Sequence, residues 1–212
     1  MVSRTRRALL QGAAALSLGL AGCSGATSSS TTVTASNRLN ADNAVLEPDH
    51  VALRSPDSSR VIWLADEAVD SPEATPDDDH RITDAEAGLI ADESTAAELR
   101  FADVDGIDDA RAFVDETDFE TETLVLEATR VPECYRLELC GATWSATDYH
   151  TYYGRVLRPA DVACETDAWD RVAHLIRLPA TLDPAEVTGR GSGTSGSGCA
   201  GFRRRYEEGQ DP

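Results

Sequence analysis

The sequence predicts a small α+β domain that consists mostly of antiparallel β-strands and carries one or two short helices. Segments rich in β-branched and aromatic residues recur along the second half of the chain, which is typical of strands. Segments rich in Gly, Pro, Ser and Asp separate them, which is typical of turns. Apolar residues follow a helical spacing only over short distances, so few helices are expected.

The chain begins with a segment typical of a secretory signal. Arg6 and Arg7 belong to a basic start, and residues 8–20 form an apolar run that is shorter than the roughly 20 residues of a spanning helix. The Leu-Ala-Gly-Cys sequence ending at Cys23 resembles a lipobox, in which the cysteine is acylated and residues 1–22 are removed. The adjacent arginines resemble a twin-arginine signal. We therefore expect a protein exported in folded form and held by a lipid at the outer, extracytoplasmic face of the cell membrane.

Three further regions follow the signal. Residues 23–45 are rich in Ser, Thr, Ala and Asn and carry almost no large apolar side chains, so we expect a disordered tether. A single β-rich globular domain is expected over residues 46–188. Residues 189–212 are expected to form a Gly/Ser-rich loop and a C-terminal tail.

The elements of the domain can be placed in order. Asp108 or Asp109 can cap a short helix that ends near Asp115. Residues 84–99 are ambiguous, with some helical character and poor periodicity. Turns are expected at residues 55–59 and 145–148. The expected strands cover residues 51–54, 60–65, 98–104, 123–129, 134–144, 149–157 and 172–178.

The chain is strongly acidic. It contains 38 Asp and Glu, 19 Arg and no Lys, and three of the arginines lie in the leader, so the remainder has 16 positive and 38 negative groups and a net charge of −22. Such a body repels nucleic acid and anionic membrane surfaces, since both are polyanions. The acids are spread along the chain and not gathered at ligand spacing. Adaptation to high salt, which screens charges within a few Å, is therefore favoured over calcium binding.

Lipidation of Cys23 leaves four cysteines, Cys134, Cys140, Cys164 and Cys199. An even number in an exported protein favours disulfides. The alternative is a metal site, but the 5, 23 and 34 intervening residues do not match a zinc pattern. We expect no metal and no cofactor.

A hairpin around residues 145–148 orders the strands next to the cysteines. If these four residues form the loop, Trp144 lies opposite Tyr149 and Cys140 lies opposite Tyr153. A one-residue slip or a bulge would reverse the facing.

The same register guides the disulfide pairing. It places Cys134 opposite Pro159, and Cys164 follows at the same end of the hairpin, so the pair Cys134–Cys164 is favoured and Cys140 is left for Cys199. The pair Cys140–Cys164 stays open as the alternative.

Histidines are the first candidates for chemistry. His80 follows three aspartates and could bind a cation, although an acidic loop is expected in an acidic protein without one. His174 lies in an apolar strand and is expected to be structural. His150 is expected on a surface strip together with Tyr149, Tyr152 and Tyr153. The sequence contains no nucleophile elbow, phosphate-binding loop, zinc-protease motif or calcium loop, so no catalytic residue is assigned.

Two resemblances bear on function. Asp118-Phe119 before a strand, the turn Val131-Pro-Glu-Cys-Tyr135 and the segment Arg171-Val-Ala-His-Leu-Ile-Arg-Leu-Pro179 resemble the PrcB C-terminal-like family, although Glu133-Cys134 replaces the family's Gly-Gly pair. The acidic, lysine-free lipoprotein pattern is similar to that of haloarchaeal surface lipoproteins without an assigned activity.

The resemblances imply an extracytoplasmic binding or protease-associated module and not an enzyme. We therefore expect a lipid-anchored binding or interaction module with a protein partner at the cell surface. A secreted hydrolase, or another enzyme with an unrecognised site, is the alternative.

Overall fold

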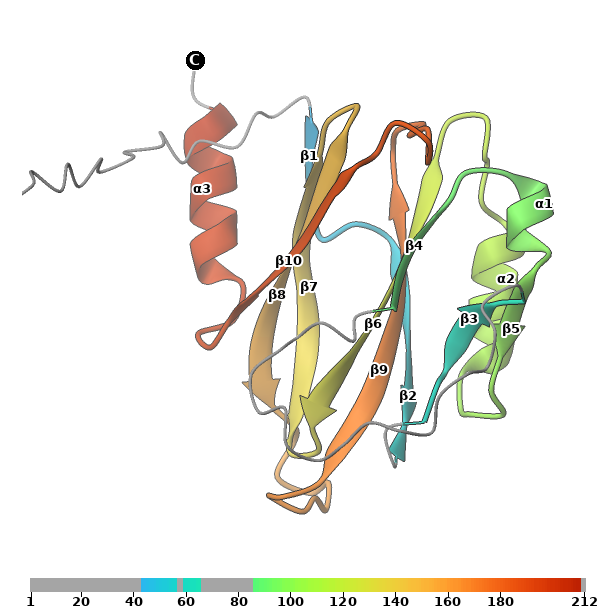
Figure 1. The fold of residues 1–212 in the computed structure, drawn as a ribbon. Helices are drawn as coiled ribbons and strands as arrows, with labels where there is room; N and C mark the ends of the chain where they lie inside the picture. Colours follow the sequence, from blue (N-terminus) through green and yellow to red (C-terminus); the bar gives the residue numbers. More distant parts are fainter. Residues whose placement is uncertain (1–42, 57–58, 66–85, 211–212) are drawn as a thin grey trace, which may run out of the picture. The chain divides into compact units, whose positions relative to one another are not determined.

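The computed structural model describes residues 43–56, 59–65 and 86–210 (Figure 1). The signal, Cys23, most of the predicted tether and His80 lie outside these ranges. The strands are β1 (Ala44–Leu46), β2 (His50–Ser55), β3 (Ile62–Leu64), β4 (Glu86–Ile90), β5 (Leu99–Phe101), β6 (Thr123–Pro132), β7 (Tyr135–Trp144), β8 (Asp148–Leu157), β9 (Trp169–Leu178) and β10 (Gly189–Ser195). The helices are α1 (Glu93–Ala96), α2 (Ile107–Asp115) and α3 (Ala200–Gln210).

Eight strands form two four-stranded sheets that lie face to face (Figure 1). The outer sheet has the order β1-β7-β8-β10, and the central sheet has the order β2-β9-β6-β4. The strands β3 and β5 form a separate antiparallel pair. All strand pairs are antiparallel except β8 and β10. The α+β class with mostly antiparallel strands is confirmed, and the described residues contain three helices where one or two were expected.

The strands β6 and β9 form the middle of the central sheet. They pair over ten positions, from Thr123 opposite Leu178 to Pro132 opposite Trp169. Both are buried along most of their length. A strand that is covered on both faces needs apolar residues without strict alternation, which explains the continuous Leu-Val-Leu run at residues 124–126.

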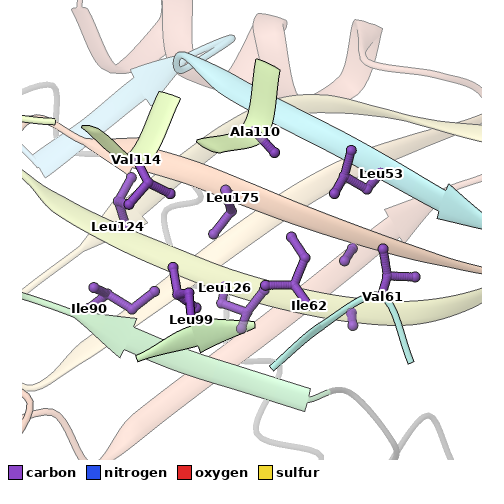
Figure 2. Packing of buried hydrophobic residues seen from close by; sticks show 12 residues of the cluster. Leu53, Val61, Ile62, Ile90, Leu99, Ala110, Val114, Leu124, Leu126 and Leu175 are labelled. Atoms are coloured by element: carbon purple, nitrogen blue, oxygen red, sulfur yellow. The ribbon is translucent and has the colours of Figure 1, made fainter. Parts of the chain in front are cut away.

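Each face of the central sheet belongs to its own core. Figure 2 shows the helix-side core, in which the central sheet packs against α2, β3 and β5; its members include Leu53, Leu124, Leu126, Leu175, Ala110, Val114, Ile62 and Leu99. The inter-sheet core lies between the two sheets and includes Val125, Ile176, Leu178, Leu139, Ala142, Tyr149 and Tyr153. Full burial of a Leu, Ile or Val side chain stabilises the fold by about 1.5–3 kcal/mol.

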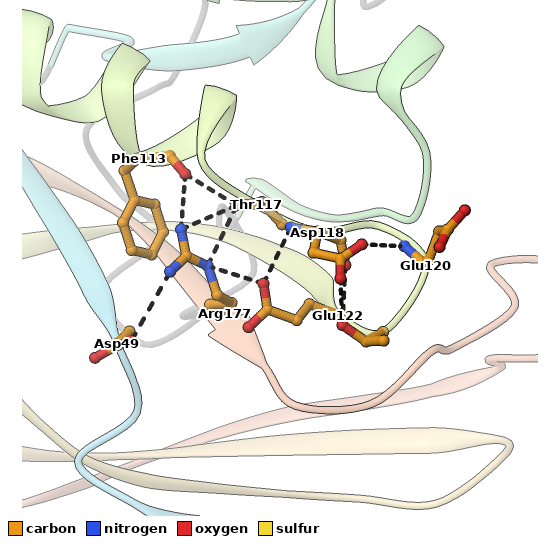
Figure 3. Close-up of polar contacts among 8 residues, drawn as sticks. Asp49, Phe113, Thr117, Asp118, Glu120, Glu122 and Arg177 are labelled. Atoms are coloured by element: carbon orange, nitrogen blue, oxygen red, sulfur yellow. Dashed lines mark hydrogen bonds and ion pairs between the residues drawn. The ribbon is translucent and has the colours of Figure 1, made fainter.

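Arg177 of β9 joins the central sheet to the end of α2 (Figure 3). Its guanidinium lies 4.2 Å from the centre of the Phe113 ring and donates to the Phe113 carbonyl oxygen at 2.9 Å and to Thr117 Oγ1 at 3.2 Å. It also forms ion pairs with Glu122 at 3.3 Å and Asp49 at 3.8 Å. Because the last carbonyls of a helix have no partner within it, this arginine satisfies one of them and fixes the helix on the sheet.

The start of α2 corrects a prediction. The N-cap is Gly106 and not Asp108 or Asp109. Gly106 has φ of 86°, a left-handed conformation that a residue without a Cβ adopts readily. Asp108 and Asp109 lie in the first turn, where their negative charge interacts favourably with the positive end of the helix dipole.

The predicted hairpin between β7 and β8 is confirmed, but its loop is one residue shorter than expected, because β8 begins at Asp148. Trp144 lies opposite Tyr149, and the Ser145 N–H donates to the Asp148 carbonyl oxygen at 2.8 Å. The Ser145 hydroxyl also accepts from the backbone N–H groups of Thr147 and Asp148, both at 3.2 Å. A serine that satisfies the free N–H groups of a tight turn is a frequent local arrangement.

The register beyond this loop is not as expected. Gly141 lies opposite Tyr152, but Leu139 lies opposite Tyr153, so Cys140 is an extra residue that forms a bulge. The predicted position of Cys140 opposite Tyr153 is therefore wrong. The bulge changes the phase of the alternation, so that Leu137 and Leu139 before it and Ala142 and Trp144 after it all face the inter-sheet core.

The C-terminal region is ordered and was predicted to be a loop and tail. Residues 189–195 form β10, which pairs in parallel with β8 from Gly189 opposite Asp148 to Ser195 opposite Gly154. The side chains of this Gly/Ser-rich segment do not predict a strand. The strand forms because its backbone pairs with the edge of β8. The helix α3 follows and contacts β1 and β7.

Gly141 allows α3 to approach the outer sheet. A Cβ at this position would lie 2.0 Å from Cε1 of Phe202 and 2.5 Å from the Val45 carbonyl oxygen. Phe202 is buried and stacks on Tyr152 with ring centres 4.5 Å apart. The close contact between helix and sheet thus requires glycine at position 141, next to the bulge at Cys140.

We predict that Gly141→Ala destabilises the protein by about 1–3 kcal/mol, because the added methyl group displaces Phe202 and its helix. Urea unfolding at fixed salt measures this as a lower midpoint. Gly88→Ala is the matched control, since a Cβ at Gly88 meets nothing within 4 Å. Equal midpoints for the two variants would contradict this account of the helix packing.

Candidate functional site

The structure contains two disulfides, Cys134–Cys164 and Cys140–Cys199, with Cα atoms 5.1 and 5.0 Å apart. The favoured pairs are confirmed, and the alternative pair Cys140–Cys164 is wrong. The bulge makes Arg158, and not the expected Pro159, the neighbour of Cys134. This is seen in the hydrogen bond that the Arg158 N–H donates to the Cys134 carbonyl oxygen. The pairing survives this error, since Cys164 still lies at the same end of the hairpin.

Three of the four histidines lie in the part of the chain that the structure describes. His50 is exposed, and its Nδ1 lies 2.9 Å from the Pro48 carbonyl oxygen. His150 is exposed next to Gly191. His174 is buried, which agrees with a structural role. The predicted surface strip around His150 is wrong in part, because Tyr149 and Tyr153 alternate with it and face the inter-sheet core.

A buried polar cluster lies within the inter-sheet core. We define it as Glu127, Thr151, Tyr153, Tyr149 and His174. Glu127 of β6 accepts hydrogen bonds from Thr151 Oγ1 and the Tyr153 hydroxyl of β8, both at 2.7 Å. Burial raises the pKa of Glu127, and the two hydroxyl donors and the charge of His150 oppose this shift. The sequence signal for this cluster is Glu127, the one acidic residue of β6, which directly follows the apolar run Leu124–Leu126.

His174 is the direct cross-strand neighbour of Glu127 in the β6–β9 ladder. Neither of its ring nitrogens has a hydrogen-bond partner, and its ring centre lies 5.0 Å from that of Tyr153. Burial, with a smaller contribution from His50, lowers the pKa of His174 to about 3. The imidazole is therefore neutral at physiological pH.

Tyr149 completes the cluster on β8. Its hydroxyl is buried and has no hydrogen-bond partner. Burial and the nearby Glu127 raise the pKa of Tyr149 to about 12, and Arg190 opposes the shift. Tyr149 and Arg190 are register neighbours on the parallel strands β8 and β10.

A cleft of about 270 Å³ opens beside Tyr149, between the edge strands β4 and β10. Leu89 contributes from β4 and Arg190 from β10, and the segment before β10 contributes the rest of the wall. The lining residues that bear on binding are Leu89, Tyr149, Pro184, Val187, Thr188 and Arg190. The lining of the cleft thus combines apolar and polar residues.

A second surface feature lies at the other end of the sheets. We call it the tip: the β6–β7 turn, the β8–β9 loop and the adjoining residues Leu157 and Trp169. Leu157 is 67% exposed and Trp169 is 44% exposed, and they are the exposed large hydrophobic residues of the described chain. The Cys134–Cys164 disulfide joins the turn to the loop.

Arginines order the tip. The guanidinium of Arg130 lies 5.5 Å from the centre of the Trp169 ring, and that of Arg155 lies 5.1 Å from the centre of the Tyr135 ring. Arg54 of β2 pairs with Asp170 and donates to the Tyr135 carbonyl oxygen at 2.9 Å. These contacts hold aromatic rings and guanidinium groups in fixed positions at the surface.

Comparison with known proteins gives no relative. No family model, no curated protein and no solved structure matches the chain. Among the helices of the described ranges, none is long and apolar enough to span a membrane. In the same ranges no three or more His, Cys, Asp and Glu side chains are grouped to hold a metal ion.

We predict that Glu127→Gln stabilises the protein near neutral pH, on the order of 1 kcal/mol for each pKa unit of the shift that it removes. Because folding raises the pKa of Glu127, its stabilising contribution is complete below the unfolded value near 4.5 and is lost as the pH rises through the folded value. The melting temperature of the variant, measured from pH 4 to 8, should therefore rise further above that of the wild type as the pH increases. Parallel curves would contradict a buried ionisable carboxyl.

His174→Leu should change how stability depends on pH in the acidic range. Folding lowers the pKa of His174 from 6.5 to about 3, so the wild type loses up to about 5 kcal/mol as the pH falls through that interval. The variant should lack this loss when unfolding is measured between pH 7 and 3. An unchanged acid slope in His174→Leu would contradict this account of the buried imidazole.

Proposed function

We propose that the chain is a lipid-anchored extracytoplasmic surface protein that binds a protein partner through its tip. The arginine pair Arg6-Arg7 and the lipobox ending at Cys23 support export and anchoring. The resemblance to extracytoplasmic binding modules points the same way. The observation that carries the binding role is the exposure of Leu157 and Trp169 together at one end of the sheets.

The position of the tip supports this role. Ala44, the first residue of β1, lies opposite Thr143, which is next to the β7–β8 loop. The tip lies at the other end of β7, and ten strand residues span about 33 Å. The tip is therefore remote from the point at which the chain arrives from its predicted anchor (Figure 1).

The composition of the tip is that of an interaction surface. Trp, Tyr and Arg are the residue types that contribute most to protein interfaces, and here Trp169 and Tyr135 are each covered by a guanidinium group. Ordered side chains lose less entropy on binding. In roughly 1 M salt the Debye length is about 3 Å, so apolar and direct contacts dominate recognition. The tip offers both.

The alternative function is that of a secreted hydrolase or another enzyme, and the cleft beside Tyr149 favours it. Glu127 has the raised pKa of a general acid, but its side chain is buried and bonded to Thr151 and Tyr153. Nucleophilic catalysis needs a hydroxyl or thiol within reach of a base. In the described ranges no Ser, Thr or Cys side chain forms a hydrogen bond with a histidine. The binding role is therefore preferred.

Anchoring is tested by Cys23→Ser. Without the thiol, the chain should keep its leader or be released into the medium, and the membrane fraction should lose it. A second variant, Arg6→Lys with Arg7→Lys, should abolish export by the route for folded proteins. Mass measurement of the mature chain and fractionation check both results. An unchanged mass and membrane fraction in Cys23→Ser would rule out the lipid.

Partner binding is tested by cross-linking from the tip. A photoreactive amino acid at Leu157, in the full chain on intact cells, should give one discrete adduct with a surface protein. The same residue at Ala97, which is exposed beside α1, is the control and should give none. Trp169→Ala should remove the adduct while the melting temperature changes little, because the residue lies at the surface and is 44% exposed. Equal adducts from both positions, or none from Leu157, would overturn the proposed role.

A further inference from the structure

The cleft between β4 and β10 has features of a ligand site that the proposed role of the tip does not use. It lies beside Tyr149, close to the β7–β8 loop, and so at the opposite end of the outer sheet from the tip. Leu89, Pro184 and Val187 provide apolar contacts. Leu89 and Val187 also pack on the inter-sheet core, which holds these two side chains in place.

The polar side chains in the lining of the cleft, those of Tyr149, Thr188 and Arg190, all carry hydrogen-bond donors. The Tyr149 hydroxyl belongs to a buried lining residue and has no hydrogen-bond partner, and buried polar groups normally have one. Arg190 is its register neighbour, and its charge acts on the Tyr149 phenol. A guanidinium has five N–H donors in a planar fork, so it can bind a further acceptor besides its contacts within the protein. Thr188 adds a hydroxyl at the rim.

We propose that this cleft binds a small organic carboxylate with a short apolar body. The carboxylate accepts from the Arg190 fork and from Tyr149, and the apolar part contacts Leu89 and Val187. Paired N–H donors of arginine match the two oxygens of a carboxylate, which makes this the anion of choice for the site. The proposal goes beyond partner binding at the tip and does not depend on it.

The strong negative charge of the protein does not prevent anion binding. At roughly 1 M salt, charges farther away than about 3 Å are screened, so only groups in direct contact with the ligand act on it. Of the acids near the cleft, Asp183 accepts from the Ala185 N–H and Asp148 from the Ser145 hydroxyl. Glu186 is exposed. Arg190 is the charged group in the lining itself.

The size of the cleft selects the probe. A volume of about 270 Å³ corresponds to roughly nine water molecules at about 30 Å³ each, and benzoate has a similar number of non-hydrogen atoms. A ligand of this size is expected to bind in the millimolar range. Benzyl alcohol has the same ring without a charge, and benzylammonium carries the opposite charge.

The experiment follows the methyl resonances of Leu89 and Val187 during titration of the full-length mature chain in molar salt. Benzoate should shift them with saturation, and the two other probes should bind roughly tenfold more weakly or not at all. Arg190→Gln should weaken benzoate binding roughly tenfold. Arg130→Gln, which removes an arginine at the tip, should have no effect.

Two further measurements keep the test decisive. Tyr149→Phe keeps the ring and removes only the hydroxyl, so it should weaken benzoate binding even where Arg190→Gln does not fold. The comparison of the three probes needs no variant. Equal binding of benzoate and benzyl alcohol, an unchanged affinity in Tyr149→Phe, or no shift with benzoate would each overturn the proposal. Loss of the tip adduct without loss of benzoate binding would overturn only the role of the tip.

Discussion

Both hydrophobic cores pack against the antiparallel pair of β6 and β9, one core on each face. Its ten paired positions send alternate side chains to the helix-side core and to the inter-sheet core. Leu124, Leu126 and Leu175 serve the first core, and Val125, Ile176 and Leu178 serve the second. A shift of one residue in this ladder would exchange the two sets and misplace Arg177, which fixes α2. The whole fold therefore depends on this register.

The inter-sheet core also contains the polar cluster, and this has a consequence for specificity. Apolar contacts are non-directional and would tolerate several positions of one sheet over the other. Hydrogen bonds from Thr151 and Tyr153 to Glu127 are directional and join β8 to β6 at one position. The buried carboxyl reduces stability at neutral pH, but its two bonds define how the sheets are aligned.

The sequence predicted the elements that are recognisable from their side-chain pattern. It missed the features that depend on backbone conformation. The strands of the β7–β8 hairpin, the position of its turn and both disulfides follow from alternation, turn residues and chain geometry. The bulge at Cys140, the glycine cap at Gly106 and the parallel strand β10 depend on backbone conformation or on pairing with distant segments. The polar cluster was missed because its members are far apart in the sequence and meet only when the sheets pack.

Disulfides hold two segments that bury few apolar groups, and the two proposed sites lie next to these segments. β10 is rich in Gly and Ser, and in α3 Phe202 is the buried residue, so the Cys140–Cys199 bond secures this region. Cys134–Cys164 secures the exposed loop of the tip. Loops of these lengths correspond to about 4 kcal/mol of reduced unfolded-state entropy per disulfide. Arg190 in the cleft and Trp169 at the tip adjoin the segments so fixed. The disulfides thus keep binding groups ordered in segments that have little apolar packing of their own.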